Sequence, residues 1–227
     1  MAREVSRLIA QGVVVVLSPL ALGCSASIST QVSEPVRPPQ PAEVAVLAIM
    51  PGTVETGSEW IRPETMHRLV AALADRYPAI EIVSPEESAQ RLTDRSLAQE
   101  YASLLEDFER AGVVDPARVE NVLRAVGATH FLHVQAGYFG EGLQRATPNF
   151  GGSPVFYSTK RQRLYAVARL WEFARSGPSW EAVVSSESEA GPFSRDRQPT
   201  DLVESLVLSV AERAPLGGPI SADATRR

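Results

Sequence analysis

The sequence predicts an α/β fold: a single domain in which flanking helices cover a mixed β-sheet. Three observations predict it: a continuous apolar run at 44–50, apolar residues at helical spacing between 62 and 126, and alternating residues between 129 and 185. A continuous apolar run is typical of a strand buried on both faces, whereas alternation indicates a strand with one buried face. The length of 227 residues suits one domain with additional terminal segments.

Residues 1–23 have the organisation of a secretory signal peptide. Arg3 and Arg7 precede an uncharged stretch at 8–22, which is shorter than the about 20 residues that span a bilayer. The stretch ends in Leu-Ala-Leu-Gly-Cys, which resembles the lipobox of bacterial lipoproteins. That resemblance implies acyl chains on Cys24. Because Ser25 follows in place of Asp, it also implies the outer membrane. The alternatives are an uncleaved anchor and a buried core cysteine.

Residues 24–42 are predicted to form a lipidated, flexible tether. They are small, polar and rich in proline, so they bury too little apolar area to fold alone. Prolines favour extended backbone. The tether is therefore interpreted as a spacer between the membrane and the domain at 43–213, although a tail without a role is the simpler alternative.

The first half of the domain alternates strands and helices. After the strand at 44–50, we expect a helix at 62–77, a short strand at 80–83, and helices following Ser84, at 96–111 and following Asp115. Ser84 and Asp115 are typical helix N-caps, and Gly112 and Gly127 are typical of helix ends. This order predicts helices on both sides of a partly parallel sheet.

The second half is predicted to be mostly strands. We expect strands at 129–138, 155–173 and 180–185, with a loop at 139–154 because that segment is rich in Gly, Asn and Pro. Thr200 is the expected N-cap of a last helix. Residues 214–227 are predicted to be a flexible tail.

Three segments resemble a periplasmic α/β domain shared by envelope lipoproteins and Tol-associated proteins. Residues 44–51 resemble its opening strand, residues 125–132 its helix-to-strand junction, and residues 170–180 its hairpin. Members are the activator lipoprotein of penicillin-binding proteins, the curli secretion lipoprotein and the N-terminal domain of the Tol translocation protein. The resemblance implies a fold more than a function. The amphipathic hairpins of a secretion pore are not recognisable in the sequence, which disfavours a pore.

The sequence offers no recognisable catalytic, metal or cofactor site. His130 and His133 are three residues apart on an expected strand, so they point to opposite faces and suit one metal ion poorly. We expect both to be surface or half-buried, and His67 to be exposed. Ser153 follows two glycines but lacks the context of a nucleophile elbow. The net charge of −5 argues against nucleic-acid binding.

One face of the strand at 155–173 is the candidate partner-binding surface, because Arg and aromatic residues are enriched at protein interfaces. The alternative is an ordinary solvated or helix-covered face. Phe150, in the expected loop, is a further candidate, because long loops are often functional. On the strand, alternation groups five candidates: Arg161, Arg163, Tyr165, Arg169 and Trp171.

Together these features predict a non-catalytic, lipid-anchored binding or adaptor protein on the periplasmic side of the outer membrane. The expected partner is an envelope protein that supports envelope or cell-wall assembly, reached through the membrane anchor. A periplasmic hydrolase or a small-ligand-binding lipoprotein is the alternative. A deep polar pocket would favour that alternative, and a shallow or Arg-rich groove would favour the adaptor. The sequence leaves the oligomeric state open.

Overall fold

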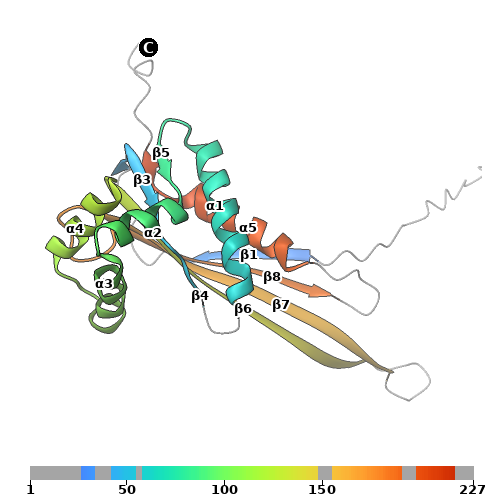
Figure 1. The fold of residues 1–227 in the computed structure, drawn as a ribbon. Helices are drawn as coiled ribbons and strands as arrows, with labels where there is room; N and C mark the ends of the chain where they lie inside the picture. Colours follow the sequence, from blue (N-terminus) through green and yellow to red (C-terminus); the bar gives the residue numbers. More distant parts are fainter. Residues whose placement is uncertain (1–26, 34–41, 55–57, 148–154, 191–197, 218–227) are drawn as a thin grey trace, which may run out of the picture.

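The computed structural model describes residues 27–33, 42–54, 58–147, 155–190 and 198–217. For residues 27–33, 42–43, 141–159 and 190, only the backbone is described. Figure 1 shows helices on both faces of one sheet, with two long strands running beyond them. The predicted α/β class, a mixed sheet with flanking helices, is confirmed.

The main sheet combines parallel and antiparallel pairing. β3 lies parallel between β5 and β6, and the short β4 also pairs in parallel with β6. The remaining neighbours are antiparallel. The order across the sheet is β1 (Ser27–Ser33), β8 (Trp180–Ala190), β7 (Val155–Glu172), β6 (His130–Thr147), β3 (Val46–Ile49) and β5 (Glu81–Val83), with β4 (Thr53–Val54) beside β6.

The helices begin and end close to the predicted residues. The Ser84 hydroxyl accepts a hydrogen bond from the Glu87 amide, and the Asp115 carboxylate accepts one from the Ala117 amide. Gly112 and Gly127 end their helices at φ +72° and +71°, where glycine is the least strained residue. The helices are η1 (Glu59–Ile61), α1 (Arg62–Arg76), α2 (Pro85–Asp94), α3 (Ala98–Ala111), α4 (Pro116–Val126) and α5 (Pro199–Arg213).

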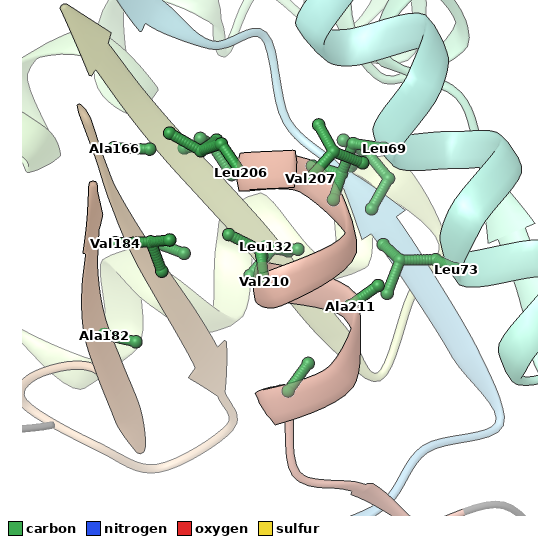
Figure 2. Close-up of a cluster of buried hydrophobic side chains, with 14 of the residues drawn as sticks. Leu69, Leu73, Leu132, Ala166, Ala182, Val184, Leu206, Val207, Val210 and Ala211 are labelled. Atoms are coloured by element: carbon green, nitrogen blue, oxygen red, sulfur yellow. The ribbon is translucent and has the colours of Figure 1, made fainter. Parts of the chain in front are cut away.

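α1 and α5 cover one face of the sheet. Figure 2 shows Leu206 and Val210 of α5 beside Leu132, Ala166 and Val184 of the strands. Leu69 and Leu73 of α1 complete this layer from the side. Residues at alternate positions of β6, β7 and β8 are all buried here, as the alternation predicts.

α2, α3 and α4 cover part of the opposite face. Phe131 of β6 and Trp171 of β7 form the floor of a second core. Tyr101 and Leu104 of α3 and Leu123 of α4 pack onto it. This second core lies at the end of the sheet where β3 and β5 pair, so the rest of that face extends beyond it.

The predicted loop at 139–154 is wrong for most of its length. β6 continues to Thr147 and pairs residue by residue with β7, from His130 with Glu172 to Thr147 with Val155. Strand pairing with a neighbour outweighs the poor intrinsic strand propensity of Gly140 and Gly142. Residues 148–154 lie outside the described residues.

Both predicted flexible ends contain paired strands. In the predicted tether, β1 pairs with β8 from Ser27 with Glu189 to Ser33 with Val183. In the predicted tail, β9 (Leu216–Gly217) pairs in parallel with β2 (Ala42–Glu43). Leu216 is buried. In each segment, backbone pairing with another strand supplies hydrogen bonds that the composition alone does not predict.

Other boundaries differ by a few residues. α5 begins at Pro199 with Gln198 as N-cap, so the predicted Thr200 cap is wrong. α3 begins at Ala98, after Ser96 at φ +59°. Within the described ranges, none of the helices has both the length and the apolar character needed to cross a membrane.

Candidate functional site

The five predicted surface residues of β7 share one face but not one environment. Arg161 and Arg163 are exposed and Tyr165 is half-buried. Arg169 is 8% exposed and Trp171 is fully buried. Alternation therefore predicts correctly which residues share this face of β7. It does not predict that the helices of the second core cover one end of that face.

Trp171 belongs to the core and not to a partner surface, which corrects the prediction. Its ring stacks on Phe131 with centroids 5.6 Å apart, and Phe108 of α3 meets it edge-on at 5.0 Å. Such aromatic pairs add to the free energy gained from area burial. Trp171 holds α3 on the sheet.

Arg169 is also unsuited to contact a partner, because acidic residues already surround it. Its guanidinium donates to the Glu181 carboxylate of β8 at 2.6 Å and to Glu109 of α3. It also lies over the Phe108 ring at 5.2 Å from the centroid. Arg169 therefore connects α3 to β7 and β8 through ion pairs with two carboxylates.

Beyond α3, part of the same sheet face carries no helix among the described residues; we call it the open face and define it by Phe139, Arg163, Tyr165 and Val183. Phe139 is 55% and Val183 38% exposed. The four residues line a hollow of about 450 Å³. Arg163 has no ion pair with any described residue, whereas Arg161 is paired with Glu187 at 2.5 Å.

Gly137 makes the open face possible. A Cβ at this position would lie 2.4 Å from the Tyr165 hydroxyl oxygen and 2.5 Å from the ring carbon that bears it. The Tyr165 ring therefore lies over Gly137 of β6, where no side chain projects from the sheet. The absence of a side chain there leaves room for the hollow beside Phe139.

Two predicted site residues lie outside the described residues. Cys24, the predicted acylation site, precedes β1 by three positions, and Phe150 lies between β6 and β7. Their roles remain predictions.

A second hollow of about 680 Å³ lies between α3 and the sheet, and we call it the α3 cavity. α3 supplies Ala102, Leu105 and Glu106 to its wall, and His133 of β6 lies against it with Thr53 of β4. Volumes of this size are usual for small-molecule sites, where mostly apolar walls carry a few polar groups.

His133 is the buried histidine of the α3 cavity, whose wall also carries Glu106, Glu109 and Arg110. It is 2% exposed, and its Nε2 lies 3.3 Å from the Thr53 hydroxyl oxygen, while its Nδ1 has no hydrogen-bond partner among the described residues. Burial lowers the pKa of His133 to about 4, helped by the positive charge of Arg169. At neutral pH the ring is therefore uncharged, with one nitrogen donating and one accepting.

Tyr101 of α3 packs against His133. Its ring meets His133 edge-on, with centroids 6.3 Å apart, and its buried hydroxyl has no partner among the described residues. Burial raises the pKa of this hydroxyl. Only His133 of this pair lines the cavity, where it can offer a neutral nitrogen beside the charged side chains of Glu106, Glu109 and Arg110.

The other two histidines lie apart from this cavity. His130 is 7% exposed, with Nε2 3.4 Å from Glu172, and His67 is exposed on α1. Burial lowers the pKa of His130, although Glu172 opposes that shift. His130 and His133 are thus more buried than predicted, while His67 is exposed as predicted. No cluster of potential metal ligands occurs among the described residues.

Sequence reasoning missed Val183 and the α3 cavity, and it assigned Phe139 to a candidate functional loop and not to a strand. Phe139 falls in the predicted loop, and Val183 has an ordinary alternating position in β8. Alternation does assign His133 to one face of β6, and Arg169 and Trp171 to one face of β7. This was the available sequence signal that polar groups lie on a face that also carries a core residue. The strand register needed to bring them together is a tertiary property.

Comparisons with known proteins identify distant structural neighbours. No family model and no curated protein matches the chain. Two solved structures of the PelC dodecamer from Paraburkholderia phytofirmans, one of them a single-residue variant, are 12% and 13% identical, with TM-scores of 0.42 and 0.41. They cover 86% and 84% of this chain and 99% and 100% of theirs.

A hypothetical protein from Chlamydia trachomatis, CT253, is 11% identical with a TM-score of 0.38 and covers 75% of this chain and 98% of its own. Function is not transferred at this level of similarity, because one fold supports many functions.

Proposed function

We propose that this protein is a lipid-anchored binding protein of the cell envelope, held at the outer membrane through Cys24 with its domain in the periplasm. The open face is the observation that carries the proposal. Phe139, Val183 and Arg163, which has no ion pair among the described residues, are exposed together on one sheet beside a hollow of about 450 Å³. Exposed apolar side chains gathered beside Arg are typical of protein interfaces.

The partner is an envelope protein that presents an apolar group to the hollow and a carboxylate to Arg163. A carboxylate on the partner would satisfy the guanidinium with a paired geometry. Confinement of both proteins to one membrane raises their effective concentration, so a modest surface suffices.

Photocrosslinking from Val183 tests this surface. A photoreactive amino acid there should capture a partner in intact cells, and Arg163→Glu should reduce capture about tenfold, as expected for an interface charge worth roughly 1.4 kcal/mol or more. Arg62→Glu, an exposed charge reversal on α1, is the matched control. Equal capture in all three proteins would contradict the proposal.

Metabolic labelling tests the anchor. A fatty-acid probe should label the wild type, and Cys24→Ala should abolish labelling and release the domain from membranes, because the acyl chain attaches through the thiol. Labelling of Cys24→Ala at the wild-type level would exclude the anchor.

A small-ligand-binding protein is the second candidate, favoured by the α3 cavity and by His133 Nδ1, which has no hydrogen-bond partner among the described residues. A small polar ligand that hydrogen-bonds to the neutral imidazole and contacts Glu106, Glu109 or Arg110 would suit it. Ala102→Trp would project bulk into this cavity from α3 and leave the open face unchanged. Loss of ligand binding in Ala102→Trp with normal crosslinking from Val183 would favour this candidate.

A further inference from the structure

Because β1 pairs with β8, few residues separate the predicted acylation site from the sheet of the domain. The predicted tether of 24–42 would reach far into the periplasm, but β1 begins at Ser27. Three residues span at most about 10 Å when extended. An acylated Cys24 would therefore hold this end of the sheet next to the lipid surface.

The same end of the sheet carries the projecting part of β6 and β7. Ser27 pairs with Glu189, Glu189 with Arg161, and Arg161 with Glu141, so these four residues form one row across the sheet. β1 runs antiparallel to β8, and β8 runs in the same direction as β6. β1 therefore begins at the end of the sheet towards which β6 continues.

β6 and β7 extend past this row as a two-stranded ribbon. The ribbon consists of 142–147 and 155–160, and Figure 1 shows it projecting away from the helices. Thr147 is six positions beyond Glu141, or about 20 Å along the strand. This distance is about twice the greatest reach of three residues, so an anchor at Cys24 would bring the ribbon within reach of the surface that holds the acyl chains.

The composition of the ribbon suits contact with lipid headgroups. Phe156 and Tyr157 occupy neighbouring positions near its far end, paired with Ala146 and Arg145. Residues 142–160 contain Arg145 and Lys160 and no acidic residue, in a chain of net charge −5. Aromatic residues favour the membrane interface, and cationic ones favour anionic headgroups.

A two-stranded ribbon is by itself marginally stable in water, because it lacks a core to pack against. β8 pairs with β7 only as far as Lys160, so beyond that position the described ribbon has no third strand. A supporting surface would therefore stabilise it.

We propose that the β6–β7 ribbon is a second membrane contact, which rests on an anionic phospholipid surface beside the acyl chains of Cys24. This inference depends on the proposed lipid anchor. It fixes the orientation of the domain: the ribbon points to the lipid, and the turn between β7 and β8 points away from it.

A single introduced thiol can report this contact, because acylation consumes the only cysteine of the chain. The full acylated protein carrying Ser158→Cys on the ribbon, or Val113→Cys between α3 and α4, would be labelled with an environment-sensitive fluorophore. Each would be reconstituted in phosphatidylethanolamine–phosphatidylglycerol vesicles that contain nitroxide-labelled lipid. Val113 is 59% exposed and lies near Ser176 at the opposite end of the sheet.

We expect lipid to quench the Ser158 label by about twofold or more and to leave the Val113 label nearly unchanged, as for a residue at the interface against one in water. Replacing phosphatidylglycerol by phosphatidylcholine, or introducing Phe156→Ser with Tyr157→Ser, should lower the quenching at Ser158. An unchanged thermal unfolding midpoint shows that the serine variants remain folded.

The two failures are distinguishable. Equal, weak quenching of both labels in acylated protein would overturn the ribbon contact and leave the anchor intact. A reactive thiol at Cys24 in the otherwise wild-type protein would overturn the anchor itself. Quenching at Ser158 that persists in phosphatidylcholine and in the serine variants would overturn the roles assigned to headgroup charge and aromatic residues.

Discussion

His133 is the residue whose chemistry the fold changes most. Its pKa falls from 6.5 to about 4 because the ring is buried and Arg169 is close. Between these values the unfolded chain binds a proton that the folded protein does not. The sign follows from proton linkage: stability is complete above about pH 6.5 and decreases as the pH falls towards 4.

Acid should therefore destabilise the protein by about 3 kcal/mol between pH 6.5 and pH 4 through His133. His130 contributes in the same direction, because burial also lowers its pKa. Urea unfolding at several pH values measures the slope. His133→Gln should flatten it, while His67→Gln, at an exposed position, should not. An identical slope in His133→Gln would contradict this assignment.

Arg169 and Arg163 lie on the same face of the same strand and should respond differently to mutation. Arg169 is buried between Glu181 and Glu109, so Arg169→Ala leaves acidic groups unpaired and should lower the free energy of unfolding by about 2–3 kcal/mol. Arg163→Ala, at an exposed position, should change it by about 0.5 kcal/mol or less. Urea denaturation gives both values, and a loss in Arg169→Ala as small as that expected for Arg163→Ala would contradict the structural role of Arg169.

At the scale of elements, the packing of β6 against β7 depends on Gly137. Gly137→Ala would place a methyl group 2.4 Å from the Tyr165 hydroxyl oxygen, so the ring must move. We expect a loss of about 1–2 kcal/mol in the free energy of unfolding. Gly177→Ala is the control, because its nearest atom would be 3.6 Å away.

A double-mutant cycle isolates the cause. In a Tyr165→Ala background, Gly137→Ala should become at least about 0.5 kcal/mol less destabilising, since the clash is gone. Strictly additive losses would show that the backbone of β6, and not the Tyr165 ring, opposes the methyl group.

At the scale of the whole molecule, both cores share one sheet and should unfold together. Trp180 lies in the core beneath α5, and Trp171 in the core beneath α3. Variants that keep only one of these two tryptophans should give the same denaturation midpoint by fluorescence and by circular dichroism, because a shared sheet couples the layers. Separate midpoints would mean that the layer of α2, α3 and α4 unfolds independently.

Several elements could be predicted because their signals are local. Ser84 and Asp115 cap helices through bonds to amides two or three positions on, and Gly112 and Gly127 end helices through their own backbone angles. Alternation along β7 also correctly assigned its two faces. Each of these depends on neighbours within a few residues, which the sequence alone displays.

Other features depend on residues far apart in the chain. β6 extends through a glycine-containing segment, and β1 and β9 form from predicted flexible ends, because each has a partner strand. Helices likewise cover Trp171 and Arg169 but leave Arg163 exposed, although the three residues share one face of β7. Sequence periodicity describes a face but not what lies upon it.

The sequence by itself determined the α/β class, the local helix boundaries and the single cysteine at which an anchor is predicted. Only the tertiary structure decided which part of the β7 face is open, that His133 borders a cavity, and that β1 begins at the end of the sheet from which the ribbon extends. The physical reason is range: caps and periodicity act over a few residues, whereas burial, charge pairing and strand register depend on contacts between distant segments.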